Sequence, residues 1–201
     1  MSKLDFQPIT EDFVSKRISK INVKKATGID GISSKLLHHA KPMIVKPITD
    51  LVNLSQSTST FQDSLKTAQV APIDKKNSVL EKGNYRPVSV LPSISKIFET
   101  AIETQLSDNF KTFFNPFLAA FRAGYGCQST LVHAIEDWKK ALDSDRYIAA
   151  ILMDLSKAFD YLPHDLLLLK LKYYGLSESA LSLLNSYLCK RKQWVKILVK
   201  C

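Results

Sequence analysis

The sequence predicts an α/β (α+β) fold that is rich in helices. Apolar residues recur at helical spacing in several stretches, as at Val14, Ile18 and Ile21 after Thr10, which suits a helix cap. The run 67–73 is short, apolar and partly β-branched, which favours a strand. Because 45% of the 201 residues are apolar, the chain can bury a core, and we expect one domain or a large piece of one.

Two extended segments flank a basic turn. The first, 67–73, runs into one acidic and two basic residues at 74–76, and the glycine-containing stretch 83–87 precedes a second extended piece at 88–91. Turn-forming residues between two short strands are typical of a β-hairpin. The sequence therefore predicts a hairpin with a cationic tip, which suits contact with phosphate.

Further elements follow from the same reasoning. Helical patterns cover 33–40 and continue towards 55, with Pro42 and Pro47 dividing or kinking the run, and others cover 94–106, 131–142 after a cap at Ser129 or Thr130, 163–175 and 177–189. We interpret 94–106 and 131–142 as packing helices. A last strand is expected at 194–199.

An acidic residue ends a long apolar run. Residues 147–153 are apolar without interruption and lead into Asp154, a pattern that suits a strand covered on both faces. A carboxylate there is costly to desolvate unless it is paired or binds a cation, and open sheets place their sites at strand ends. From the pattern alone, Asp154 as a metal ligand and Asp154 as the cap of the next turn both stay open.

The charge balance favours polyanions. The formal net charge is +9, from 28 Lys and Arg against 19 Asp and Glu, and such an excess attracts nucleic acid. In the loop 120–127, aromatic, basic and glycine residues surround Arg122, which fits a nucleic-acid contact and equally an ordinary tight turn. The basic loop 24–31 holds Gly28 and Gly31, which suit positive φ or a close backbone approach.

Cysteine usage and hydropathy indicate the compartment. Cys127, Cys189 and Cys201 are odd in number and widely spaced, so neither a disulfide framework nor a zinc site is indicated. No apolar stretch approaches the roughly 18 residues of a membrane span, and the N-terminus lacks a signal core. We expect a soluble protein inside the cell, in the nucleus or the cytoplasm, without membrane contact.

The heptapeptide Asp-Leu-Ser-Lys-Ala-Phe-Asp at 154–160 resembles motif A of the reverse transcriptases of non-LTR (LINE-type) retrotransposons. Four more blocks resemble that family in the same order: KKATGIDGIS, NYRPVSVLPSISKIFE, FRAGYGCQSTL, and LPHDLLLLKLKYYGL followed by SYLCKRKQWVKI. The similarity runs from about residue 6 to the end. It implies a partial right-hand polymerase with helices around an incomplete sheet, in which about 1–145 forms fingers and connecting helices and about 146–201 starts the palm.

The resemblance implies a function for several residues. Asp154 would bind two catalytic Mg²⁺ ions with the carbonyl of Leu155, so that a primer 3′ hydroxyl is activated and the leaving group stabilised. The incoming dNTP would meet the backbone amides of Lys157 and Ala158, the sugar gate Phe159, and the phosphate-binding Arg86 with Lys75 or Lys76. The partners implied are an RNA template and a DNA primer, with Arg122 as a further nucleic-acid contact.

The family pattern is not complete in this sequence. The later Tyr-x-Asp-Asp motif and the block before it do not occur, so we expect a weak magnesium site and no polymerase activity from this chain alone. Tyr161 and the pair at 119–120 also depart from the usual residues. Asp160 is interpreted as a residue that initiates the helix entered through Pro163.

Two other hypotheses stay open. The chain could be a basic, non-catalytic module that holds RNA or a template–primer. It could also be a remnant of a mobile element, partly folded because its sheet has an exposed edge. The reading frame downstream discriminates between the enzyme and the remnant: an adjoining Tyr-x-Asp-Asp block favours the enzyme, and its absence from the gene favours the remnant.

Overall fold

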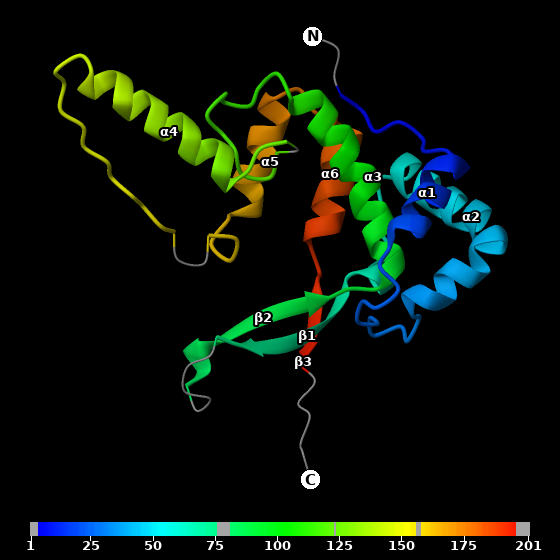
Figure 1. Ribbon diagram of the computed structural model, residues 1–201. Coiled ribbons are helices and arrows are strands. Elements are labelled where there is room, and N and C mark those ends of the chain that lie inside the picture. Colours follow the sequence, from blue (N-terminus) through cyan, green and yellow to red (C-terminus); the bar gives the residue numbers. More distant parts are fainter. Residues whose placement is uncertain (1–3, 76–80, 123, 156–157, 196–201) are drawn as a thin grey trace. The chain divides into compact units, whose positions relative to one another are not determined.

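The computed structural model describes residues 4–75, 81–122, 124–155 and 158–195 (Figure 1). The chain divides into two compact units: the first comprises 1–107 and 163–201, and the second comprises 108–162. The first unit is therefore built from two separate stretches of chain. Helices dominate and a small mixed sheet completes the first unit, so the α+β expectation is confirmed.

Helix α1 (Glu11–Lys20) begins where the sequence predicts. The Thr10 hydroxyl accepts a hydrogen bond from the Phe13 amide at 3.2 Å, which satisfies one of the free N–H groups of the first turn. Acidic residues in the first turn and basic residues in the last complement the helix dipole. Val14 and Ile18 are fully buried, which confirms the predicted core face.

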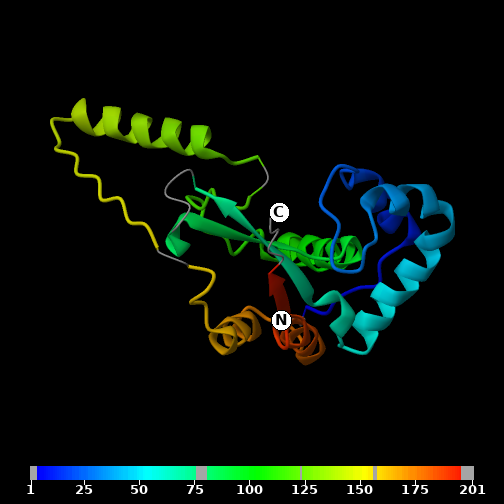
Figure 2. The same cartoon turned by 90° about the horizontal axis from the view of Figure 1, so that it is seen from below.

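Helix α2 (Ser34–Ser57) packs against α1, and Figures 1 and 2 show the two side by side. It is one continuous helix with Pro42 and Pro47 inside, so these prolines do not divide it as one reading of the sequence allowed. The Ser33 hydroxyl caps the helix by accepting from the Leu36 amide.

The sheet has the strand order β2-β1-β3. Strands β1 (Thr67–Asp74) and β2 (Tyr85–Val90) are antiparallel, which confirms the predicted hairpin. Strand β3 (Lys192–Val195) pairs in parallel with the start of β1, so the C-terminal stretch completes a sheet begun more than a hundred residues earlier. Of the predicted strand 194–199, residues 196–199 lie outside the described residues.

Three more helices belong wholly or largely to the first unit. They are α3 (Ser93–Phe110), α5 (His164–Tyr173) and α6 (Glu178–Leu188), and Figure 2 shows α6 leading into β3. The sequence predicts α6 over 177–189, and the Ser177 hydroxyl caps it by accepting a hydrogen bond from the Ala180 amide. Helix α5 follows Pro163 directly, and its first-turn acid is Asp165. The expectation for Asp160 is wrong, since Asp160 lies in a turn outside the helix.

Phe61 joins the two stretches of the first unit. Its side chain is 1% exposed, and its ring meets the ring edges of Phe98 on α3 and Tyr187 on α6 at centroid distances of 5.5 and 5.0 Å. Its amide donates to the Ser186 hydroxyl at 3.0 Å. T-shaped aromatic pairs contribute beyond their buried area, so this cluster fastens α6 to α3.

A polar network continues from this cluster. The Tyr187 hydroxyl donates to a Glu99 carboxylate oxygen at 2.9 Å, and the Arg191 guanidinium lies 4.4 Å from the Tyr187 ring centroid. Burial, together with the nearby Glu99 carboxylate, raises the pKa of Tyr187 to about 12. The phenol is therefore held in its protonated, hydrogen-bonding form.

Gly28 and Gly31 serve the two purposes that the sequence allowed. A Cβ at Gly28 would lie 2.7 Å from the Pro92 nitrogen and 2.9 Å from the Leu91 carbonyl carbon, so the basic loop touches the backbone that enters α3. Gly31 has φ of +70°. The close approach at Gly28 admits no side chain.

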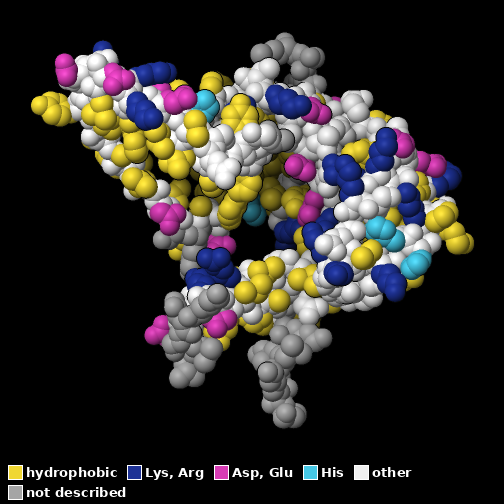
Figure 3. Space-filling view, viewed as in Figure 1, with side chains coloured by type: hydrophobic (Ala, Val, Ile, Leu, Met, Phe, Trp, Pro, Cys, Tyr) yellow, Lys and Arg dark blue, Asp and Glu magenta, His cyan; other side chains and the backbone are white. Residues whose placement is uncertain are grey.

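The second unit contains helix α4 (Cys127–Leu142), whose N-cap is Gly126. The predicted caps Ser129 and Thr130 are instead residues of the first turn, where the Ser129 hydroxyl accepts from the Gly126 amide at 3.0 Å. The apolar side chains of α4 are exposed (Figure 3), namely Leu131, Val132, Ile135, Trp138 and Leu142. The expected packing face is not covered by any residue that the structure describes.

Residues 147–155 contradict the predicted buried strand. They form no strand, and the side chains of Ile151, Leu152 and Met153 are between 86% and 92% exposed. A strand needs a neighbour to satisfy its backbone groups, and no described strand pairs with this segment. Among the described helices, none has the length and apolar character to cross a membrane.

We predict that Gly28→Ala destabilises the first unit by about 1–3 kcal/mol, because the new methyl group meets backbone atoms that cannot rotate away. Chemical denaturation monitored by circular dichroism measures this change. Gly83→Ala is the matched control, because nothing lies within 4 Å of a Cβ at that position. Equal stabilities of the two variants would contradict the close approach.

The raised pKa of Tyr187 predicts a loss of stability at high pH. The unfolded chain loses the phenol proton near pH 10 and the folded chain near pH 12, so the stability that this group contributes is complete below pH 10 and is lost through this window. In urea unfolding at several pH values, the stability advantage of the wild type over Tyr187→Phe should shrink between pH 10 and 12. If the unfolding free energies of the two proteins change with pH in parallel, the raised pKa of Tyr187 makes no contribution and the prediction is wrong.

Candidate functional site

The tip of the β1–β2 hairpin holds Lys75, one of the predicted phosphate-binding residues. Its amide donates to the Asn84 carbonyl at 2.8 Å and its ammonium to the Gly83 carbonyl at 2.9 Å. Lys75 therefore closes the turn with both backbone and side chain while staying exposed. Its alternative, Lys76, lies outside the described residues.

Arg86 lies opposite Ile73 in the hairpin register and is exposed. Among the described residues it has no carboxylate in ion-pair contact. A guanidinium offers five donors in a planar fork that matches phosphate oxygens. Arg86 can thus bind an anion without first breaking a salt bridge.

The motif at 154–160 lies in the second unit. Asp154 and Leu155 are exposed at the end of the extended segment, and Ala158 and Phe159 begin the turn that follows. Leu155 is 77% and Phe159 79% exposed. Lys157 lies outside the described residues.

Phe159 contacts a residue that sequence reasoning missed. Its ring meets the edge of the Phe121 ring at a centroid distance of 6.2 Å and an angle of 82°. Phe121 has φ of +60° and is 95% exposed, an arrangement that is uncommon for a bulky residue. The contact joins the motif at 154–160 to the loop 120–127. The aromatic residues of the loop 120–127 indicated a contact surface, but the sequence alone does not show which residue they contact.

The Arg122 side chain donates hydrogen bonds within the second unit, to the backbone that precedes its own loop. One terminal nitrogen donates to the carbonyls of Asn115 at 3.2 Å and Leu118 at 3.0 Å, and the guanidinium lies 4.2 Å from the Tyr125 ring centroid. Gly124 supplies a positive φ of +83° beside it. Arg122 therefore stabilises a turn, and its contact with nucleic acid stays a prediction for the remaining donors.

The described residues do not by themselves fit a pair of magnesium ions. Among them, no three His, Cys, Asp or Glu side chains gather as metal ligands. Asp154 offers a single carboxylate, whereas magnesium needs a nearly octahedral set of oxygen ligands. Lys75 and Arg86 belong to the first unit, and Asp154, Leu155, Ala158, Phe159 and Arg122 belong to the second.

Comparison with known proteins identifies the family. Residues 73–199 match the model of the reverse transcriptase (RNA-dependent DNA polymerase) family. The chain is 27% identical over 203 residues to a probable RNA-directed DNA polymerase from transposon BS of Drosophila melanogaster, covering 96% of this chain and 22% of that protein. It is 27% identical to the polymerase from mobile element jockey of Drosophila funebris, covering 94% of this chain and 21% of the relative.

A probable polymerase from the transposon X-element of Drosophila melanogaster is 30% identical, covering 84% of this chain and 20% of that protein. The chain thus spans about a fifth of the length of these relatives. The matched range contains the end of β1, the tip of the β1–β2 hairpin, strand β2 and the motif at 154–160. The chain belongs to the reverse transcriptase (RNA-dependent DNA polymerase) family, as its resemblance to the non-LTR retrotransposon enzymes predicted.

Proposed function

We propose that this chain supplies the fingers and the start of the palm of an RNA-directed DNA polymerase that adds dNTPs to a primer 3′ end. The observation that carries the proposal is that one family match, over residues 73–199, includes the cationic hairpin tip, Arg86 and Asp154. About 1–145 would form the fingers and connecting helices, and about 146–201 would begin the palm.

The hairpin would bind the triphosphate of the incoming nucleotide. Arg86 is exposed and has no acidic partner among the described residues, and Lys75 holds the turn closed while its charge stays at the surface. Charge-assisted hydrogen bonds from a guanidinium to phosphate are short and directional. The backbone amides of Lys157 and Ala158 are proposed as further donors.

Phe159 would screen the sugar of the nucleotide, supported from one side by Phe121. The edge-to-face contact of these rings restricts where Phe159 can point, and a fixed aromatic surface discriminates shape better than a free one. Asp154 would be one ligand of the catalytic Mg²⁺, with the carbonyl of Leu155 beside it. The remaining ligands are not among the described residues.

A second candidate is a basic module that binds RNA or a template–primer without catalysis. The net charge of +9 supports it, as does Arg86, which has no ion-pair partner in the part of the chain that the structure describes. RNA binding by a longer form of the protein that extends no primer would favour this alternative.

We predict that the 201-residue chain extends no primer on poly(rA)–oligo(dT) with Mg²⁺, whereas a form extended by the sequence encoded downstream does. In the extended form, Asp154→Ala should lower the rate about 100-fold or more, because a lost metal ligand removes several kcal/mol of charge stabilisation. Asp143→Asn is the control, since Asp143 is an exposed acid at the C-terminus of α4.

Two outcomes of this assay would contradict the proposal. If the 201-residue chain extends primers and its Asp154→Ala variant does not, the chain supplies its own complete set of acids. If the extended form keeps its rate after Asp154→Ala, Asp154 is no metal ligand.

The hairpin proposal predicts that Arg86→Ala raises KM for dNTP about 10-fold or more in the extended form. The lost charge-assisted hydrogen bonds are worth about 1.5–3 kcal/mol, and about 1.4 kcal/mol corresponds to tenfold. Arg86→Lys should restore part of the affinity, because the charge returns without the fork. Lys16→Ala, which removes a lysine already paired with Asp12, should leave KM unchanged. An unchanged KM in Arg86→Ala would remove Arg86 from the nucleotide site.

A further inference from the structure

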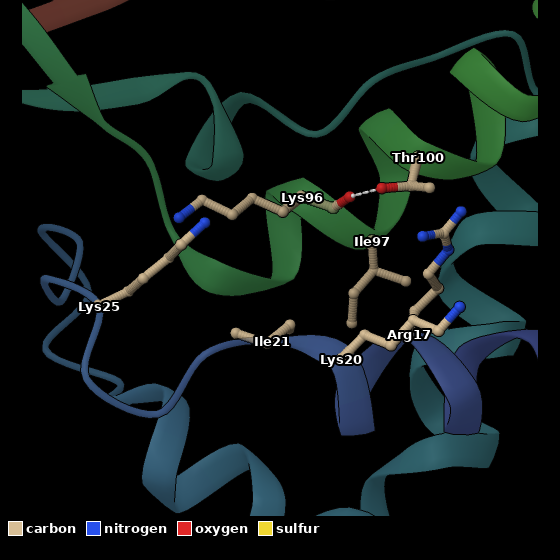
Figure 4. A pocket seen from close by; sticks show the side chains of 7 residues that line it. All are labelled: Arg17, Lys20, Ile21, Lys25, Lys96, Ile97 and Thr100. Carbon is tan, nitrogen blue, oxygen red and sulfur yellow. Dashed lines mark hydrogen bonds between the residues drawn. The ribbon is translucent and has the colours of Figure 1, made fainter. Parts of the chain in front are cut away.

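A pocket of about 220 Å³ lies in the first unit between α1, the basic loop that follows it, and α3 (Figure 4). Four cationic side chains line it: Arg17, Lys20, Lys25 and Lys96. Ile21 and the buried Ile97 supply its apolar wall, and Thr100 adds a hydroxyl. Three of the four cations precede the residues 73–199 that match the family.

Packing holds the α1 side of the pocket in place. Arg17 is half-buried, with its guanidinium carbon 5.4 Å from the Phe13 ring centroid and one terminal nitrogen 3.5 Å from the Thr104 hydroxyl. The Ile21 carbonyl lies 2.8 Å from His38 Nε2, which ties the end of α1 to α2. The pocket therefore has a defined wall, built on helices.

The close approach at Gly28 holds the other side. Gly28 lies against the Leu91–Pro92 backbone, and α3 starts at Ser93, so the loop that carries Lys25 reaches the helix that carries Lys96. Figure 4 shows the ammonium ends of Lys25 and Lys96 pointing toward one another. Two like charges that converge are unfavourable unless an anion joins them.

The four cations are not compensated within the described part of the chain. None of them is in ion-pair contact with a described carboxylate, whereas other lysines of the same unit are, for example Lys16 with Asp12 and Lys46 with Asp50. A polyanion presents oxygen atoms along its length to several such cations. Phosphate has this chemistry, and the apolar wall leaves room for the sugar attached to it.

We propose that this pocket binds the phosphodiester backbone of a single-stranded nucleic acid, with RNA as its natural strand. This proposal rests on the proposed function in one respect, namely that the bound strand is the RNA template of the polymerase. A strand is favoured over a free polyphosphate because the whole protein is basic and counterion release rewards contact with a polyanion. Contacts of this kind position a strand and do not read its sequence.

The test is fluorescence anisotropy of a labelled single-stranded RNA with the full chain, without dNTP, over a range of salt concentrations. For the variant Lys20→Ala/Lys25→Ala/Lys96→Ala we expect the slope of log K against log [salt] to fall by about 2, because each lost contact on a single strand removes about 0.7. Affinity at 0.1 M salt should drop roughly 100-fold, equally for two unrelated RNA sequences.

The matched control removes three lysines that are paired with acids: Lys16→Ala/Lys46→Ala/Lys172→Ala. The net charge changes equally, but the slope should change by less than half as much. The single variants Lys20→Ala and Lys25→Ala, both at exposed positions, separate lost contacts from lost folding. Thermal unfolding by circular dichroism checks every variant.

Equal slopes for the pocket and control variants would overturn the proposal, since only overall charge would then matter. A pocket variant that keeps RNA affinity but loses binding of inorganic tripolyphosphate would overturn it in favour of a small polyphosphate ligand. Because no dNTP or catalysis enters this assay, either result is independent of the primer-extension test.

Discussion

The burial of Phe61 between Phe98 and Tyr187 is the contact on which the first unit depends. The unit consists of two stretches of chain separated by 55 residues, numbers 108–162, and closing such a loop costs entropy that long-range contacts must repay. Phe61 stands just before β1, and α6 stands just before β3, so the aromatic cluster and the parallel pairing of β1 with β3 support each other. Without them, β3 would lose the partner that defines it.

Both cationic surfaces belong to the first unit. The hairpin extends from β1, which is held from the other side by β3, and Lys75 closes its tip. The basic pocket uses α3 of the same core, which also carries Phe98. Helices α1 and α3 place Arg17, Lys20 and Lys96, and the loop whose Gly28 touches the backbone before α3 places Lys25. Rigid elements position charged groups for a polyanion better than mobile loops do.

The second unit has a different physical character. Large apolar side chains on α4 and along 147–155 are exposed, and the described sheet does not include this segment. Asp154 and Phe159 are the residues that the family resemblance marks most strongly, and both are in this unit. The ring of Phe159 is held by its edge-to-face contact with Phe121. The chain spans about a fifth of the length of its relatives, and exposed apolar patches of this size are typical of contact surfaces.

Local chemistry alone sufficed for the helix cap at Thr10, the β1–β2 hairpin and the positive φ of Gly31, because each depends on neighbours in the chain. The seven-residue motif at 154–160 likewise identified the family. The sequence could not show that 147–153 stays outside a sheet, because burial of an apolar run depends on which strands lie next to it. The sequence also could not show that Arg17, Lys20, Lys25 and Lys96 line one pocket, because Lys96 lies more than 70 residues after the other three. That juxtaposition exists only because α1, the loop and α3 pack together, and tertiary packing alone decided it.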